Sequence, residues 1–153
     1  MHLFSKKRPG LLLFDVNETL LDLSHMKEAV NTTFGNEMAF QLWFSLLIQY
    51  AQVENVTGTY HDFSKVGQAV MYMMAEKTGQ EVPEAKQKEL VEMVKSSQPH
   101  PDVIPGLQGL QEAGFRLATL SNSPAKSSFP HLEAVGLKGF FEGTLSVDGV
   151  EKF

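Results

Sequence analysis

The sequence contains no cysteine, a single tryptophan and no long apolar run. The lack of cysteine excludes a disulfide framework and thiol chemistry, and it fits a cytoplasmic location. The apolar stretch 42–48 is interrupted by Ser45 and is far shorter than the roughly 20 residues of a membrane-spanning helix. We therefore expect a protein with no membrane partner.

Positive charge is also scarce. The formal net charge is −5, and it is spread along the chain instead of being gathered in blocks. This balance argues against nucleic acid or an anionic membrane as the main partner. The only arginines are Arg8 and Arg116. A length of 153 residues allows one domain with a core, or a small core with an inserted subdomain.

The most informative segment is Phe14–Asp22, which reads FDVNETLLD. The apolar run 11–14 before it predicts a strand buried on both faces. Asp15 follows this strand directly and thus lies at its carboxyl end, where open α/β sheets bind ligands. Thr19 is four residues further on, near enough for a turn to bring its hydroxyl beside Asp15. The pair suits a carboxylate nucleophile that forms an ester, although an aspartate that caps a turn is the alternative interpretation.

A helical block is predicted over residues 21–98. Ser24 is the expected N-cap of a helix that runs to Phe34, and Gly35 is the expected stop. A second helix carries a wide apolar stripe at helical spacing, and Trp43 belongs to it. Aromatic residues in such stripes commonly fill a core. A helical block inserted after a catalytic strand would nevertheless cover the site, so we predict that Trp43 lines it.

The pattern changes after the proline-rich segment 97–101. An apolar strand over 115–120 ends in Ser121 and Asn122, a helix follows over 124–135, and a third strand is predicted over 143–147. The resulting layout is a parallel βαβαβ unit. The carboxyl ends of its strands lie at one edge of the sheet. The Ser121 hydroxyl and the Asn122 amide could therefore meet an oxyanion held near Asp15.

These strand ends resemble the motifs of the haloacid dehalogenase superfamily of hydrolases. The first motif, an aspartate with a threonine four residues on, matches Asp15 and Thr19 in LLLFDVNETLLD, and the second matches Ser121 in LATLSNSP. The segments LQEAGFRLATLSNSP and GTLSVDGVEKF are most similar to the 2-haloacid dehalogenase branch. The resemblance implies an α/β fold with a Rossmann-like parallel sheet. Residues 1–20 and 99–153 would form a C-terminally incomplete core, and residues 21–98 an inserted helical cap.

The resemblance also implies a mechanism. Asp15 would attack an electrophilic carbon or phosphorus, and water would hydrolyse the resulting ester. Thr19, Ser121 and Asn122 would hold the anionic part of the substrate. The residues implied in substrate contact are Val16, Asn17 and Trp43. The substrate would be a small 2-haloacid or a related organic acid, and dehalogenase chemistry would need no cofactor.

Two positions depart from the family pattern. Superfamily phosphatases carry a second aspartate two residues after the nucleophile, where this chain has Asn17. An amide cannot shuttle a proton, which favours dehalogenase-like chemistry. Dehalogenases in turn use an arginine of the cap, and residues 21–98 contain none. A Mg²⁺-dependent phosphatase acting on a phosphate ester therefore stays open, with Asp15 and the main-chain carbonyl of Asn17 as metal contacts.

The family's third motif, a lysine, is expected at about the residue after Phe153, and its acidic fourth motif lies beyond. We therefore expect a truncated core, and a third hypothesis is a catalytically incompetent fragment that acts as a binding module. In such a core the strand 11–14 would be a sheet edge with unpaired backbone groups. We expect self-association through this strand, with a homodimer as the simplest form.

Overall fold

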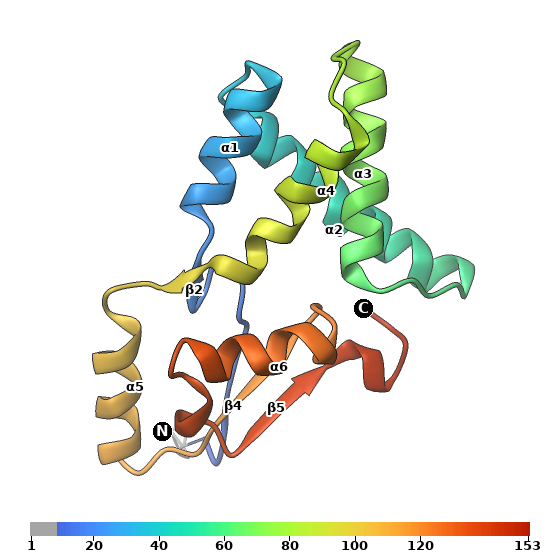
Figure 1. Cartoon of the computed structure of the whole chain (residues 1–153). Coiled ribbons are helices and arrows are strands. Elements are labelled where there is room, and N and C mark those ends of the chain that lie inside the picture. The colour runs from blue at the N-terminus through green and yellow to red at the C-terminus, as the bar shows by residue number, and fades with distance from the viewer. Residues whose placement is uncertain (1–8) are drawn as a thin grey trace, which may run out of the picture.

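The computed structural model describes residues 9–153. Residues 1–8, which include Arg8 and the beginning of the predicted core, lie outside the described residues. Two regions are apparent in Figure 1, a group of helices at the top and a small sheet with two further helices below it. The chain thus has the mixed α/β architecture that the sequence predicts.

The upper group, called here the helical region, contains four α-helices and a short 3-10 turn. They are α1 (Ser24–Phe34), α2 (Ala39–Thr57), α3 (Phe63–Thr78), α4 (Glu84–Glu92) and η1 (Met93–Ser96). The predicted apolar stripe of α2 faces inward, since Phe40, Trp43 and Leu47 are buried in a cluster shared with α1, α3 and α4. Burial of this cluster supplies the main stabilising free energy of the region.

The boundaries of α1 confirm one sequence signal and correct another. Gly35 ends the helix in the left-handed conformation, with φ of +58°, as predicted. Ser24, however, is the first helical residue and not the N-cap. Its N–H donates to the Asp22 carboxylate at 2.8 Å, and hydrogen bonds from Ser24 lower the pKa of Asp22. The prediction failed because the acceptor at the helix start is the side chain of Asp22, two residues before Ser24.

The sheet consists of β1 (Leu12–Phe14), β4 (Leu117–Ser121) and β5 (Gly143–Ser146), all parallel, in the order β1-β4-β5. The connecting helices are α5 (Val103–Glu112) and α6 (Ala125–Ala134), and short 3-10 turns, η2 (Lys138–Phe140) and η3 (Val147–Gly149), flank β5. This is the predicted parallel arrangement. Right-handed crossovers place both connecting helices on the same face of such a sheet.

The two faces of the sheet differ in what covers them. Leu12, Phe14 and Leu117 point towards α5 and α6, where they join a second apolar cluster. Side chains alternate along a strand, so Leu13, Leu120 and Leu145 point to the opposite face and are 55%, 44% and 50% exposed. Within residues 9–153, β1 has a hydrogen-bonded neighbour on one side only.

Two short strands join the regions. β2 (Leu21–Asp22) and β3 (Gln98–Pro99) pair antiparallel, so the chain leaves and re-enters the sheet region at adjacent points. His131 of α6 supports this junction, since its Nε2 lies 2.8 Å from the Ser97 carbonyl oxygen. Between residues 9 and 153 no helix is both long and apolar enough for a bilayer crossing.

Candidate active site

Asp15 and Thr19 meet at the carboxyl end of β1. The Thr19 hydroxyl donates to Asp15 Oδ2 at 3.0 Å, the contact that the four-residue spacing predicts. Both side chains are exposed. Asp15 Oδ1 takes part in no hydrogen bond among residues 9–153, so only one of the two carboxylate oxygens is held.

The turn between these residues is held by backbone hydrogen bonds. The Val16 carbonyl accepts from the N–H groups of Leu20 and Leu21. Glu18 has φ of +61°, a left-handed conformation that costs a non-glycine residue on the order of 1 kcal/mol. Its carboxylate accepts from Leu23 N–H at 2.8 Å, and its own N–H donates to the Leu21 carbonyl. These bonds offset the strain and fix where Thr19 lies relative to Asp15.

The end of β4 lies beside the end of β1, because Phe14 pairs with Thr119. Ser121 is buried there, and its hydroxyl oxygen accepts from Ser123 N–H at 3.1 Å. Asn122 is half-buried. The adjacency of the two strand ends agrees with the sequence-based expectation. A cleft shared by the side chains of Asp15 and Ser121 stays a prediction.

Ser123 is a contact that sequence reasoning missed. The Asn17 side-chain amide donates to Ser123 Oγ at 2.8 Å, which ties the loop after β1 to the loop after β4. The available signal was a second hydroxyl two residues after Ser121 in the run SNSP. A lone serine in a turn is so common that this signal carries weight only once the two loops are known to be neighbours.

A cavity of about 40 Å³ lies at the boundary between the two regions. Asn17 and Ser123 line it from the sheet region, and Trp43 lines it from α2. The other lining side chains are mostly apolar and include Met26, Phe44, Leu47, Phe63 and Val94. Val16 borders a neighbouring cavity of about 20 Å³ together with Asn17 and Ser123. The structure thus gathers the three residues predicted to contact substrate around one boundary.

Trp43 forms a rigid wall of this cavity. It is 5% exposed, and its indole N–H donates to the Gly67 carbonyl at 2.9 Å. A Cβ at position 67 would lie 3.3 Å from the indole ring, so the absence of a side chain at Gly67 allows α3 to approach this closely. Core packing and cavity lining are therefore compatible roles for Trp43.

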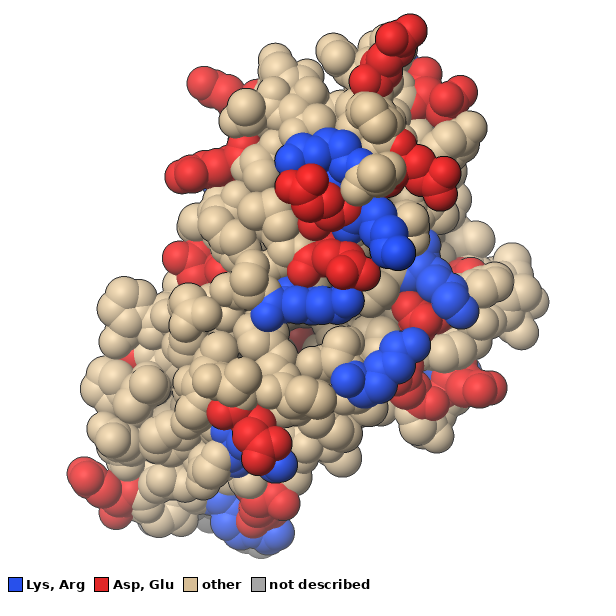
Figure 2. Space-filling view, in the orientation of Figure 1, with Lys and Arg blue, Asp and Glu red and all other residues tan. Residues whose placement is uncertain are grey.

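Lysines, not an arginine, border the site on the helical side. Lys65, Lys88 and Lys95 line a cavity of about 100 Å³ that also touches Ser123 and Ser127. Arg116, the one arginine of the described part of the chain, is engaged with Glu142 instead. Figure 2 shows lysines interspersed with acidic side chains across this face, in keeping with the spread charge of the sequence.

The donor set for a magnesium ion is incomplete in this chain. Asp15 offers a carboxylate and Asn17 a main-chain carbonyl, but Mg²⁺ prefers a larger set of oxygen ligands. No group of three His, Asp or Glu side chains suited to a metal occurs among residues 9–153. The residues described here do not by themselves fit the ion.

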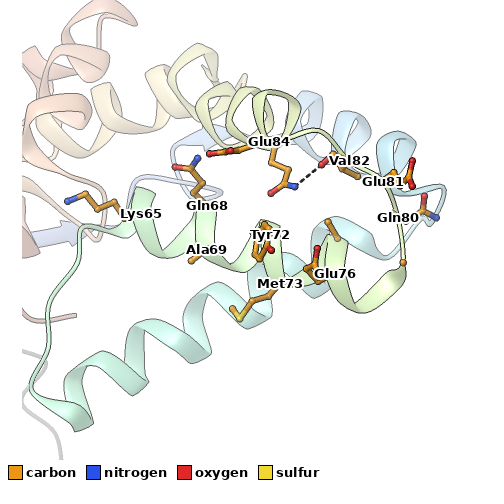
Figure 3. Close-up of a pocket in the computed structure, with 13 residues that line it drawn as sticks. Lys65, Gln68, Ala69, Tyr72, Met73, Glu76, Gln80, Glu81, Val82 and Glu84 are labelled. Carbon is orange, nitrogen blue, oxygen red and sulfur yellow. Dashed lines mark hydrogen bonds between the residues drawn. The ribbon is translucent and has the colours of Figure 1, made fainter.

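A wider groove of about 960 Å³ lies elsewhere, on the helical region between α3 and the segment leading into α4. Figure 3 shows polar residues at its rim, with Tyr72 and Met73 on the α3 side. All residues that line it lie between positions 65 and 87, so Asp15 and Ser121 take no part in it. The larger hollow is therefore separate from the strand ends at which Asp15 and Ser121 lie.

Comparison with known proteins agrees with the geometry. A family model described as haloacid dehalogenase-like hydrolase matches residues 10–153. The chain is 25% identical over 150 residues to haloacetate dehalogenase H-2 of Moraxella sp. (strain B), covering 96% of this chain and 66% of that protein. It is also 25% identical over 156 residues to phosphoglycolate phosphatase of Nitrosococcus oceani, covering 93% and 63% respectively.

Solved structures show the same fold. L-2-haloacid dehalogenase from Xanthobacter autotrophicus superposes with a TM-score of 0.81 at 24% identity, over 94% of this chain and 59% of that one. The chain therefore spans about two thirds of the length of the curated relatives that it matches. Because the family model matches nearly all of the sequence, the chain belongs to the haloacid dehalogenase-like hydrolases.

Proposed function

We propose that the chain carries the nucleophile of a hydrolase that acts on a small 2-haloacid or a related organic acid. The observation that carries this proposal is the contact between Thr19 and Asp15 at the end of β1. One oxygen of the carboxylate is oriented by a neutral donor, while the other is free to attack. The matched dehalogenases support this choice of substrate class.

The reaction proceeds in two steps. Asp15 Oδ1 forms a bond to the carbon that bears the halogen, and the carbon–halogen bond breaks with its electron pair leaving on the halide. Water then attacks the carbonyl carbon of the Asp15 ester, and the hydroxy acid leaves with one proton from that water while the other passes to solvent. The aspartate is regenerated as a carboxylate, so atoms and charge balance.

The helical region is proposed to act as the cap over this site, with residues 1–20 and 99–153 as the core and 21–98 as the cap. The boundary cavity has a mostly apolar lining, which suits the carbon atoms of such a substrate, but its volume of about 40 Å³ is that of about one or two water molecules and Asp15 is not among its lining residues. Asn17 and Val16 would contact it from the core, and Trp43 from the cap. Ser121 and Asn122 would hold its carboxylate, with Lys95 as a cation at the rim. A cytoplasmic location is part of this proposal.

The second candidate is a Mg²⁺-dependent phosphatase, which the matched phosphoglycolate phosphatase supports. Asn17 argues against it, because its amide is committed to Ser123 and cannot serve as a general acid or base. The third candidate is a catalytically incompetent fragment whose sheet acts as a binding module, with the edge strand β1 as the expected site of self-association.

One experiment separates the three candidates. Turnover is measured with 2-chloropropionate, with chloroacetate and with phosphoglycolate, each with EDTA and with added Mg²⁺. We expect halide release that EDTA leaves unchanged. Asp15→Asn should abolish it with the fold intact, because an amide of the same shape is a poor nucleophile, and Thr19→Ala should reduce it less. Phosphate release restored by Mg²⁺ would establish the second candidate, and no turnover of any substrate the third.

A further inference from the structure

A second contact between the two regions lies far from the β2–β3 junction. It joins the connection between α2 and α3 to the segment after β5, and Figure 1 shows the C-terminal end of the chain beside that connection. The Tyr60 hydroxyl donates to Asp148 Oδ1. The Asn55 side chain donates to the Phe153 carbonyl at 2.7 Å and accepts from its N–H at 2.9 Å. We call these five residues the tail contact: Asn55, Tyr60, Phe63, Asp148 and Phe153.

Apolar packing reinforces the tail contact. The Phe153 ring lies 5.4 Å from the ring of Tyr60 and 5.6 Å from that of Phe63, measured between centroids. Glu151 turns the chain back towards the helical region with φ of +50°, a strained conformation that these contacts compensate. Burial and the hydrogen bond to Asp148 raise the pKa of Tyr60 above its ordinary value.

Asp148 also contacts the start of α6, next to the loop 121–124 of the candidate site. Its Oδ2 accepts from Ala125 N–H at 2.8 Å, which caps the start of α6 directly after the loop 121–124. Its own N–H donates to Ser146 Oγ, and that hydroxyl donates to the Ser123 carbonyl at 2.9 Å. The two oxygens of one carboxylate are thus divided between the helical region and the first residue of α6, which directly follows the loop that receives the Asn17 amide.

We propose that Asp148 is a positioning residue that couples the placement of the helical region, through Tyr60, to the order of the loop 121–124. The proposal depends on the proposed function only in treating that loop as part of the site. The coupling has a direction. When Tyr60 holds Asp148, the helical region is closed against Ser123, and when the contact opens, α6 loses part of its cap.

The test uses Trp43, the single tryptophan, as a reporter of closure, because it lines the boundary cavity with Asn17 and Ser123. Tyr60→Phe removes one hydroxyl and keeps the ring beside that of Phe153. A hydrogen bond to a charged group shifts an equilibrium by roughly tenfold or more, so we expect a corresponding rise in the open population. The expected readouts are stronger acrylamide quenching of Trp43 fluorescence and a shift of its emission to longer wavelength.

Tyr72→Phe is the matched control, since Tyr72 is 55% exposed on α3 and forms no hydrogen bond among the described residues. Hydrogen exchange over residues 121–127 gives a second readout that does not depend on catalysis. It should quicken in Asp148→Ala and in Tyr60→Phe but not in Tyr72→Phe. The double variant Tyr60→Phe/Asp148→Ala should differ little from Asp148→Ala alone.

Quenching of Trp43 in a folded Tyr60→Phe protein that equals the wild-type value would overturn the closure step. Unchanged exchange at 121–127 in Asp148→Ala would overturn the coupling to the loop. Where the wild type turns over substrate, Tyr60→Phe should raise KM while kcat is nearly unchanged, because Asp15 is untouched. An inactive wild type with a positive quenching result would reject the proposed function and leave the coupling in place.

Discussion

The helical region packs its apolar side chains around one core, whereas the sheet is covered mainly on one face. In the helical region Met26, Val30 and Met71 are 0% exposed, and the cluster around them, called closed here, takes buried side chains from α1, α2, α3 and α4. In the sheet region Leu13 and Leu145 are half-exposed on the face opposite to α5 and α6. The two regions are of similar chain length, so size does not explain the difference.

The helical region contributes rigid packing, whereas the polar groups of the candidate site lie in the sheet region. The closed helical cluster provides a rigid wall for the boundary cavity, with Trp43 fixed against Gly67. The sheet supplies the polar groups, which lie on loops at the strand ends where hydrogen bonds hold them in place. A site between a closed and an open region can therefore change its chemistry without a change in the packing of the helical region.

The largest effect should come from a truncation in the closed cluster. Met71→Ala removes a fully buried side chain and leaves a cavity, so we expect a loss of about 2–5 kcal/mol in the free energy of unfolding. Leu145→Ala on the open face should cost about 1 kcal/mol or less, since half of that side chain is already in water. Urea unfolding measures both. Equal losses would show that the open face is covered in solution.

The sequence was sufficient for the framework on both sides of this comparison. Short apolar runs that end in polar residues predicted the parallel strands, and spacing predicted the contact between Asp15 and Thr19. Gly35 marked a helix end because few other residues adopt its left-handed conformation. Each of these signals is local, since the residues that produce it lie within a few positions of one another.

Two of the contacts that the sequence did not reveal are long-range. Asn17 and Ser123 are 106 residues apart, and Tyr60 and Asp148 are 88 apart, so no periodicity connects them. Their pairing depends on how the helical region sits on the sheet, which follows from the packing of whole elements. The N-cap of α1 was predicted wrongly for a local reason. Several polar residues near a helix start compete for the same N–H groups, and here Asp22 accepts the hydrogen bond.

A smaller effect should appear in self-association, which the open edge of β1 predicts. Leu13→Lys places a charge on the exposed face of that strand, a change that discourages strand pairing. We expect the wild-type chain to sediment faster with rising concentration and Leu13→Lys to remain closer to a monomer. Leu42→Lys is the control, because Leu42 is 48% exposed on α2 and lies in the closed region. A wild-type chain that is monomeric at all concentrations would contradict the prediction.

The smallest effect should come from the ion pair between Arg116 and Glu142, which joins the start of β4 to the start of β5. The guanidinium donates twice, Nε to Oε2 at 2.8 Å and Nη2 to Oε1 at 2.6 Å, but both side chains are exposed to solvent. Arg116 lowers the pKa of Glu142 from its ordinary value of 4.5, chiefly through these hydrogen bonds. The folded state therefore binds the proton less tightly than the unfolded state. The stabilisation is present above the ordinary value and is lost as the pH falls through the lowered one.

We expect Glu142→Gln to lower the unfolding midpoint slightly at pH 7 and not at all in strong acid. Added salt should shrink the difference at pH 7, because exposed charges are screened. Glu112→Gln provides the comparison, since Glu112 is exposed on α5 and forms no ion pair within residues 9–153. A midpoint difference that persists in strong acid and high salt would mean that Glu142 stabilises the sheet by packing and not by charge. The open region would then depend on its side-chain contacts as much as the closed one does.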